Sequence, residues 1–184
     1  MRIIGGDLKR RTLSSVKGIQ TRPTSDKLRE AIFNIISSDV CGTIVVDLFA
    51  GTGALGLEAL SRGSDFALFI DNNKTSLGVI EKNIQALGLT AKTKIQCWDI
   101  LKNLSCLKLI EAKFDIVFMD PPYNKNIIQP ALVNLYNSNH IKKESLIIIE
   151  HSVLEPIPTN FNGFELTDQR KYGKTLVSFL KMET

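Results

Sequence analysis

Residues 44–56, with the sequence IVVDLFAGTGALG, contain the pattern that decides the fold. The apolar run 44–49 is typical of a buried strand, and the glycines after it predict a sharp turn that leads into a helix. Gly51, Gly53 and Gly56 match the pattern G-x-G-x-x-G, in which the backbone approaches a ligand or a neighbouring helix closely. Such a strand, turn and helix predict an α/β sheet with a ligand site beside the glycine loop.

Strands and helices alternate along the rest of the chain. We expect further strands over residues 66–70, 94–98, 114–119 and 146–149, and helices over residues 25–38, 54–61, 77–87 and 128–135. This alternation predicts a mostly parallel sheet with helices on both faces. Residues 163–170 and 174–182 are two further strand-like runs joined closely around Tyr172 and Gly173, which predicts an antiparallel C-terminal hairpin.

The N-terminal part of the chain is basic. Residues 1–30 hold eight basic and three acidic side chains, a net charge of +5, whereas the rest of the chain carries a net charge of −1. The asymmetry suggests a polyanionic partner, although a solvated tail that only aids solubility has the same composition. We therefore expect a basic extension over residues 1–24 and an α/β domain over residues 25–184.

The composition excludes several other classes of protein. The 184 residues are 43% apolar and 23% charged, which is typical of a globular domain. Three scattered cysteines without a C-x-x-C pair disfavour a disulfide scaffold, and the two histidines share no metal-ligand spacing, so we expect no metal site. No apolar run approaches the roughly 20 residues of a membrane-spanning helix. We expect a cytoplasmic protein that binds no membrane.

Acidic residues lie at or near the ends of four expected strands, namely Asp47, Asp71, Asp99 and Asp120. Any one of them can cap a loop, but four at one rim indicate a ligand site, because ligands bind beyond the carboxyl ends of such strands. Asp71 lies 20 residues after Gly51, which is also compatible with a nicotinamide-linked oxidoreductase. Asp47 opposes that alternative, since its carboxylate would repel a pyrophosphate and favour a cationic ligand.

Residues 47–56 resemble the first motif of class I S-adenosylmethionine-dependent methyltransferases. The resemblance implies a Rossmann-like fold and S-adenosylmethionine as cofactor, with Asp47 near the amino group, Asp71 at the ribose and Asp99 at the adenine edge. The cofactor-binding residues that it implies are Asp47, Phe49, Ala50, Gly51, Thr52, Gly53, Asp71, Asn72, Asp99 and Ile100.

A second motif, Asp120-Pro121-Pro122-Tyr123, directly follows the fourth expected strand. Two prolines alone would indicate a rigid turn, but a turn explains neither the acid before them nor the aromatic after them. The motif resembles the (Asp/Asn)-Pro-Pro-(Tyr/Phe) signature of methyltransferases that act on planar nitrogen atoms. The resemblance implies that Asp120, Pro121, Pro122 and Tyr123 are catalytic.

The chemistry of a planar nitrogen explains these residue types. Its lone pair is delocalised, so two acceptors, the Asp120 side chain and the Pro121 carbonyl, are needed to direct an NH₂ group at the methyl donor and to stabilise the developing charge. Tyr123 can stack on the base, a contact worth about 1–3 kcal/mol, once the base has left its own stack.

The segments MRIIGG at 1–6 and RPTSDKLREAIFN at 22–34 resemble the bacterial 16S rRNA guanine-N2 methyltransferases of the RsmD type. The resemblance covers essentially the whole chain, including Arg170–Lys174. It implies methyl transfer to the 2-amino group of one guanine in 16S rRNA, within an assembling or assembled small ribosomal subunit, by a monomer. The extension and the residues around Arg22 to Arg29 would bind RNA, through Arg10, Arg11, Arg22, Thr24 and Arg29.

Several alternatives stay open at the level of sequence. The family usually has Gly-Arg where this chain has Arg10-Arg11, and Arg29 can instead pair with a carboxylate on its own helix. Lys171, Tyr172 and Lys174 suit either a contact at the rim of the site or a simple turn. The motifs are also compatible with DNA adenine or protein glutamine as substrate, or with a non-catalytic RNA-binding role in ribosome assembly.

Overall fold

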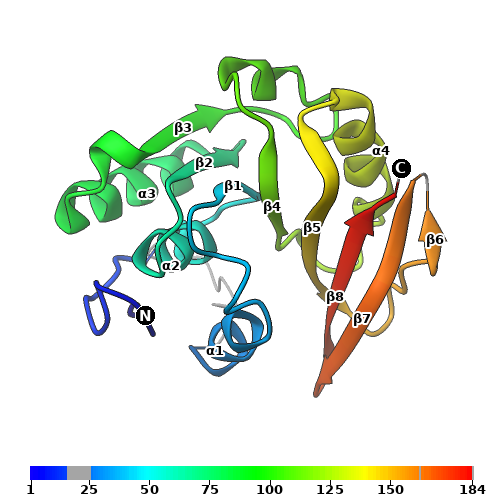
Figure 1. Cartoon of the computed structure of the whole chain (residues 1–184), viewed down its shortest axis with the longest axis horizontal. Coiled ribbons are helices and arrows are strands. Elements are labelled where there is room, and N and C mark those ends of the chain that lie inside the picture. Colours follow the sequence, from blue (N-terminus) through cyan, green and yellow to red (C-terminus); the bar gives the residue numbers. More distant parts are fainter. Residues whose placement is uncertain (16–25, 162, 184) are drawn as a thin grey trace.

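The computed structural model describes residues 1–15, 26–161 and 163–183, and most of them lie in strands and helices (Figure 1). In chain order these elements are α1 (Asp26–Ile35), β1 (Ile44–Leu48), α2 (Ala54–Ser61), β2 (Phe66–Asp71), α3 (Lys74–Leu87), β3 (Thr93–Cys97), β4 (Phe114–Met119), α4 (Ile128–Ser138), β5 (Ile141–Ser152), β6 (Asn160–Phe161), β7 (Phe164–Tyr172) and β8 (Thr175–Met182). Two short 3-10 helices, Thr90–Lys92 and Ser105–Leu109, flank β3.

The strands form one sheet of eight strands in the order β3-β2-β1-β4-β5-β8-β7-β6. The first five strands of the chain pair in parallel, and β8 returns antiparallel between β5 and β7. This arrangement confirms the predicted Rossmann-like sheet and its antiparallel C-terminal hairpin. β5 begins five residues earlier than its apolar run predicted, and the two-residue strand β6 was not predicted.

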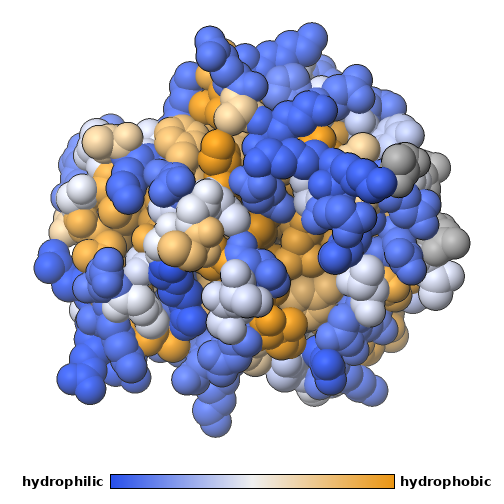
Figure 2. Space-filling model, viewed as in Figure 1, coloured by the Kyte–Doolittle hydropathy of each residue, from blue (hydrophilic) through white to orange (hydrophobic). Residues whose placement is uncertain are grey.

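Both faces of the sheet are buried, because alternate residues of its central strands point to opposite sides. On β4, Ile116 and Phe118 belong to one apolar cluster, whereas Val117 and Met119 belong to another. The helices α1, α2 and α3 cover the first side, and α4 covers the second (Figure 1). Figure 2 shows polar side chains around the rim of the molecule and apolar side chains gathered over the middle of the same view.

The first residues of the chain pack against α2. Ile3 and Leu13 are buried in the cluster beneath α1–α3, so this segment is not a free tail. Gly6 has φ of +73°, and a Cβ at Gly6 would lie 1.8 Å from the Ser61 carbonyl oxygen. Only glycine allows the segment to approach the end of α2 this closely.

Among the described residues, no helix is long and apolar enough to cross a membrane. The longest helix, α3, has 14 residues, fewer than the roughly 20 that a hydrocarbon core requires.

Candidate active site

The register of the sheet brings the predicted site residues to one edge. Leu48 at the end of β1 pairs with Ile70 of β2 on one side and with Met119 of β4 on the other. The residues that follow these three strands therefore emerge next to one another, and they include Phe49 and Asp120. Asp71 at the end of β2 pairs with Cys97 of β3, which places Asp99 close to the same edge.

The glycine loop after β1 combines tight packing with an open backbone. A Cβ at Gly56 would lie 2.5 Å from the Phe69 ring, and one at Gly53 would lie 3.3 Å from the same ring and from Ile80. These two glycines therefore allow α2 to pack against β2 and α3. Gly51 is different: its φ is +56°, and a Cβ there would find only the Phe49 carbonyl oxygen, at 3.9 Å.

Phe49 itself has φ of +61°, a conformation that costs a non-glycine residue roughly 1–2 kcal/mol. It lies directly after β1 and before the first glycine, half-buried against the apolar cluster that contains α4. Ala50 is buried, and its N–H donates to the Ile70 carbonyl at 3.0 Å. The surrounding contacts therefore hold the loop in a strained shape, which is common at ligand sites.

Asp47 is 1% exposed, and its Oδ2 accepts a hydrogen bond from the Gly56 N–H at 3.0 Å. Burial raises the pKa of Asp47 to about 8, the negative charge of Asp71 adds to the shift, and the Gly56 bond opposes it. A carboxylate that lacks both water and a cation is costly here, so a cationic group brought beside Asp47 would be strongly favoured.

Asp71 joins β2 to the glycine loop. Its Oδ2 accepts from the Gly51 N–H at 2.9 Å, and its Oδ1 accepts from the Asn73 N–H at 2.8 Å. Asn73 caps α3 by accepting from two backbone N–H groups, and Asn72 between them is exposed. Each carboxylate oxygen has two lone pairs, so Asp71 has capacity for further donors.

The segment after β3 holds the third predicted acid. Asp99 is half-buried, and its Oδ1 accepts from the Leu101 N–H at 3.1 Å. Ile100 is buried, and its carbonyl accepts from the Asn134 side chain of α4 at 2.9 Å. These bonds fix the loop at the outer end of the site.

The Asp-Pro-Pro-Tyr segment follows β4 and is fixed by its last residue. Asp120 is half-buried, Pro121 is buried and Pro122 is exposed. The Tyr123 hydroxyl donates to Glu150 Oε1 at 2.7 Å and lies 3.3 Å from Thr175 Oγ1. Burial, together with the charge of Glu150, raises the pKa of Tyr123 well above its usual value, so the hydroxyl keeps its proton.

Sequence reasoning missed two residues of this edge. Glu150 is 6% exposed and lies near the end of β5. It was missed because the strand was expected to stop at residue 149, although an acid there follows the pattern of the other four. Asn83 of α3 is 2% exposed, and its Nδ2 donates to the carbonyls of Ser14 at 3.2 Å and Thr52 at 3.1 Å. No local sequence signal marks such a mid-helix link between the N-terminal segment and the glycine loop.

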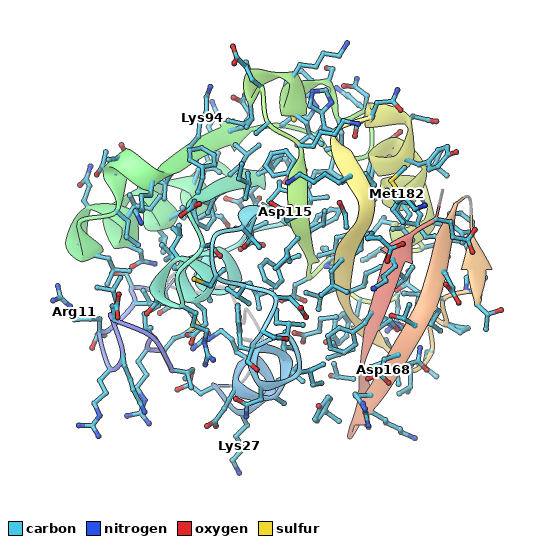
Figure 3. The ribbon with its side chains drawn as sticks, in the orientation of Figure 1. Arg11, Lys27, Lys94, Asp115, Asp168 and Met182 are labelled. Carbon is cyan, nitrogen blue, oxygen red and sulfur yellow. The ribbon has the colours of Figure 1, made fainter. Side chains whose placement is uncertain are left out.

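Two of the predicted RNA-binding arginines are exposed on the N-terminal segment. Arg11 lies at the periphery of the molecule in Figure 3, and its Nη2 donates to the Ala86 carbonyl near the end of α3 at 2.9 Å. Arg10 has φ of +71°, a conformation that glycine adopts without strain. The position therefore suits the glycine that the family usually has there. Arg22 and Thr24 lie outside the described residues.

The expectation that Arg29 contacts RNA is wrong. The side chain is 0% exposed, its Nη2 donates to Asp26 Oδ1 at 3.1 Å and to the Arg2 carbonyl, and its Nε lies 3.5 Å from Glu58 Oε2. Burial lowers the pKa of Arg29, while the charges of Glu58 and Asp26 act in the opposite direction. Arg29 lies on the inward face of α1 with Leu28, Ile32 and Phe33, so it joins α1 to α2 and the N-terminal segment.

Within the described residues, no group of three or more histidine, cysteine, aspartate or glutamate side chains is placed to hold a metal ion. Three of the acids at the strand ends, Asp47, Asp71 and Asp99, each accept hydrogen bonds from different backbone N–H groups. Their arrangement suits an extended polar ligand that passes along the edge of the sheet.

Comparison with known proteins identifies relatives along the whole chain. The Bacillus subtilis (strain 168) protein YlbH is 34% identical over 181 residues, which cover 98% of each chain. Ribosomal RNA small subunit methyltransferase D of Escherichia coli (strain K12) is 31% identical over 183 residues, covering 100% of this chain and 90% of that one. The solved structure of Escherichia coli yhhF matches with a TM-score of 0.85 at 29% identity, over 100% of this chain and 98% of that one.

The family comparison agrees with the fold and with both motifs. A family model described as Conserved hypothetical protein 95 matches residues 1–181, from the N-terminal segment through the end of the sheet. That range includes the glycine loop, the Asp-Pro-Pro-Tyr segment and the C-terminal hairpin. The chain therefore belongs to this family, the RsmD type of methyltransferase with a Rossmann-like class I fold.

Proposed function

We propose that this protein transfers a methyl group from S-adenosylmethionine to the exocyclic N2 amino group of a guanine in 16S rRNA. The observation that carries the proposal is the pairing of Leu48 with Met119, which brings the glycine loop and the Asp-Pro-Pro-Tyr segment to adjacent positions. A methyl donor on the first and an amino group on the second would then be close enough to react. Relatives named as small-subunit rRNA methyltransferases support the choice of substrate.

The residues at the sheet edge fit the proposed cofactor. The buried Asp47 suits an ammonium group, the space over Gly51 lets a ligand approach the backbone, and Asp71 has acceptor capacity for ribose hydroxyls. Phe49, Ala50, Thr52 and Gly53 would complete the loop, and Asn72, Asp99 and Ile100 would lie along the adenosine part. When bound, S-adenosylmethionine supplies an electrophilic methyl group on a sulfonium.

The protein's own part in the reaction is to orient and stabilise the amino group. The Asp120 carboxylate and the Pro121 carbonyl accept its two hydrogen bonds, which directs the nitrogen lone pair and favours positive charge on that nitrogen. Asp120 or water then takes the proton that the methylated nitrogen loses. Pro122 restricts the backbone, and the Tyr123 ring, held at its hydroxyl by Glu150, offers a face for the base.

The N-terminal segment would hold the RNA by charge. Arg10 and Arg11 are exposed there, and we propose that Arg22 and Thr24, which lie outside the described residues, extend the same contact. We further propose that the protein acts as a cytoplasmic monomer on an assembling or assembled small subunit. Residues 1–24 would then serve RNA binding, and residues 25–184 would form the methyltransferase domain.

A methyl-transfer assay with labelled S-adenosylmethionine tests the proposal. Unmodified small ribosomal subunits, protein-free 16S rRNA and duplex DNA are offered in parallel, and the labelled nucleoside is identified by mass spectrometry. We expect N2-methylguanosine from ribosomal substrate. N6-methyladenine would overturn the guanine assignment, and label in none of the three would point to a protein substrate such as a glutamine amide.

The variant Asp120→Ala separates catalysis from a purely structural role in ribosome assembly. We expect its turnover to fall at least about 100-fold, because orientation and charge stabilisation are lost together, while RNA affinity stays within about twofold. Unchanged turnover would contradict the catalytic assignment of Asp120.

A further inference from the structure

The hydrogen bonds of Tyr123 mark one face of the C-terminal half of the sheet. Residues directly opposite each other in an antiparallel pair point to the same face. Glu150 of β5 pairs with Val177 of β8, and Ser152 pairs with Thr175. Because Tyr123 contacts both Glu150 and Thr175, its hydroxyl lies on the face that these residues share.

Two residues of β7 continue this face beyond β8. Tyr172 pairs with Thr175, and Arg170 pairs with Val177, so both side chains point to the side on which Tyr123 is held. Neighbouring strands lie about 4.8 Å apart, which places β7 roughly 10 Å from β5. Tyr172 and Arg170 therefore lie one strand beyond Thr175, whose Oγ1 is 3.3 Å from the hydroxyl of Tyr123 in the Asp-Pro-Pro-Tyr segment.

On this face of the sheet, the residues of β7 are much more exposed than those of β5 and β8. Glu150 and Thr175 are each 6% exposed, whereas Tyr172 is 37% exposed and the Arg170 side chain is 57% exposed. The turn itself is explained by Gly173, which has φ of +64°. The turn requires neither an exposed aromatic ring nor a guanidinium beside it.

The end of the hairpin is also cationic. Residues 168–174 carry three basic side chains and one acidic one, a net charge of +2, in a chain whose residues 31–184 together carry −1. Arg170 Nε lies 2.9 Å from Asp168 Oδ2, and Figure 3 shows Asp168 on the lower part of the hairpin. Lys171 and Lys174 are exposed. A guanidinium next to an aromatic ring suits a nucleotide, since one binds phosphate and the other stacks on a base.

We propose that Arg170 and Tyr172 form a second contact site for the RNA strand, next to the nucleotide that is methylated. The Tyr172 ring stacks on a neighbouring base, and the Arg170 guanidinium, aided by Lys171 and Lys174, binds the phosphate backbone. The inference rests on the proposed function and adds to it, because it assigns RNA binding to a part of the chain far from the basic N-terminal segment.

The experiment compares variants of the hairpin for binding and turnover on unmodified small ribosomal subunits. We expect Tyr172→Ala to weaken binding about 10-fold and to raise KM with kcat nearly unchanged, because stacking acts equally on ground state and transition state. Tyr172→Phe keeps the stacking ring, so its binding should stay within about twofold of wild type. Affinity for S-adenosylhomocysteine and the melting temperature should not change in either variant.

The salt dependence of binding tests Arg170. Loss of one phosphate contact in Arg170→Gln should reduce the slope of log affinity against log salt by about 0.7–0.9. Lys113→Gln is the matched control, because Lys113 is exposed just before β4 at the opposite edge of the sheet. Its removal takes away the same charge and should leave the slope unchanged.

The outcomes separate this inference from the proposed function. If the wild-type protein methylates ribosomal guanine and Tyr172→Ala binds as tightly as wild type, the second contact site is overturned alone. If the wild-type protein modifies a different nucleic acid and the hairpin variants lose affinity for it, the contact site stands and the guanine assignment falls. A wild-type protein that binds no nucleic acid would overturn both.

Discussion

At the scale of single residues, the buried Asp47 carboxylate destabilises the folded protein unless a cationic group binds beside it. Its pKa is about 8 in the folded protein and near 4 in an unfolded chain, so the folded state holds the proton more tightly. The contribution of Asp47 to the free energy of unfolding is therefore at its maximum below about pH 4, and it falls progressively as the pH rises to about 8. Each pKa unit corresponds to about 1.4 kcal/mol.

The variant Asp47→Asn should therefore melt at a higher temperature than wild type, with a difference that grows between about pH 4 and pH 8. The same variant should bind S-adenosylhomocysteine about 10-fold to 100-fold more weakly, because it loses a charged hydrogen bond. Melting curves across this pH range and calorimetric titration measure the two effects. A difference in melting temperature between the variant and wild type that is the same at all pH values would contradict the burial of a titrating carboxyl group.

Arg10 shows a second cost at a single residue, since an arginine stands in a backbone conformation that suits glycine. Arg10→Gly should raise the free energy of unfolding by up to about 1 kcal/mol. RNA binding should weaken in the same variant if the arginine contacts phosphate. Lys9→Gly is the matched control, because it removes the same charge with no positive φ to relieve, and urea denaturation should show it to be no more stable than wild type.

At the scale of elements, the approach of α2 to β2 depends on Gly56. A Cβ there would overlap the fully buried Phe69 ring, so Gly56→Ala should lower the free energy of unfolding by about 1–3 kcal/mol. Gly78 lies within α3 and has nothing within 4 Å of its added Cβ. Gly78→Ala should therefore raise the free energy of unfolding by about 0.5–1 kcal/mol. Urea denaturation measures both variants, and a change of stability in the same direction for Gly56→Ala and Gly78→Ala would contradict these expectations.

At the scale of the whole molecule, Glu58 holds three segments together. Its carboxylate accepts from the backbone N–H groups of Ile4 and Gly5, each at 2.8 Å, and pairs with Arg62 and with Arg29 of α1. The side chain is 0% exposed. The N-terminal segment, α1 and α2 therefore depend on one buried charge.

Glu58→Gln should lower the free energy of unfolding by about 3–5 kcal/mol, because it removes the buried counter-charge of Arg29 and leaves only Asp26, whose side chain is 42% exposed. Glu81→Gln on the exposed side of α3 makes the same chemical change and should alter it by less than about 0.5 kcal/mol. Chemical denaturation of both variants gives the comparison. A Glu58→Gln protein as stable as wild type would show that the network contributes nothing to folding.

The sequence by itself determined the architecture and the edge at which the site lies. Buried strands alternating with helices allow few arrangements, and the carboxyl ends of parallel strands must meet at one edge. The register of β1–β4 accordingly places the strand ends that carry or precede Asp47, Asp71, Asp99 and Asp120 at one edge, and their role as a ligand site stays a prediction. The glycines of the loop were also recognised, although two of them serve helix packing.

Only the tertiary structure decided which polar residues face each other across long stretches of chain. From the sequence, Arg29 was expected to contact RNA or to pair with a carboxylate on its own helix. It does pair with Asp26 of α1, but packing of α1 on α2 also buries it against Glu58, a partner that no local pattern indicated. Glu150 and Thr175 contact Tyr123 because β8 pairs antiparallel with β5, a register that local patterns do not specify. Local periodicity decides which face of an element is apolar, but only the assembled core decides what that face meets.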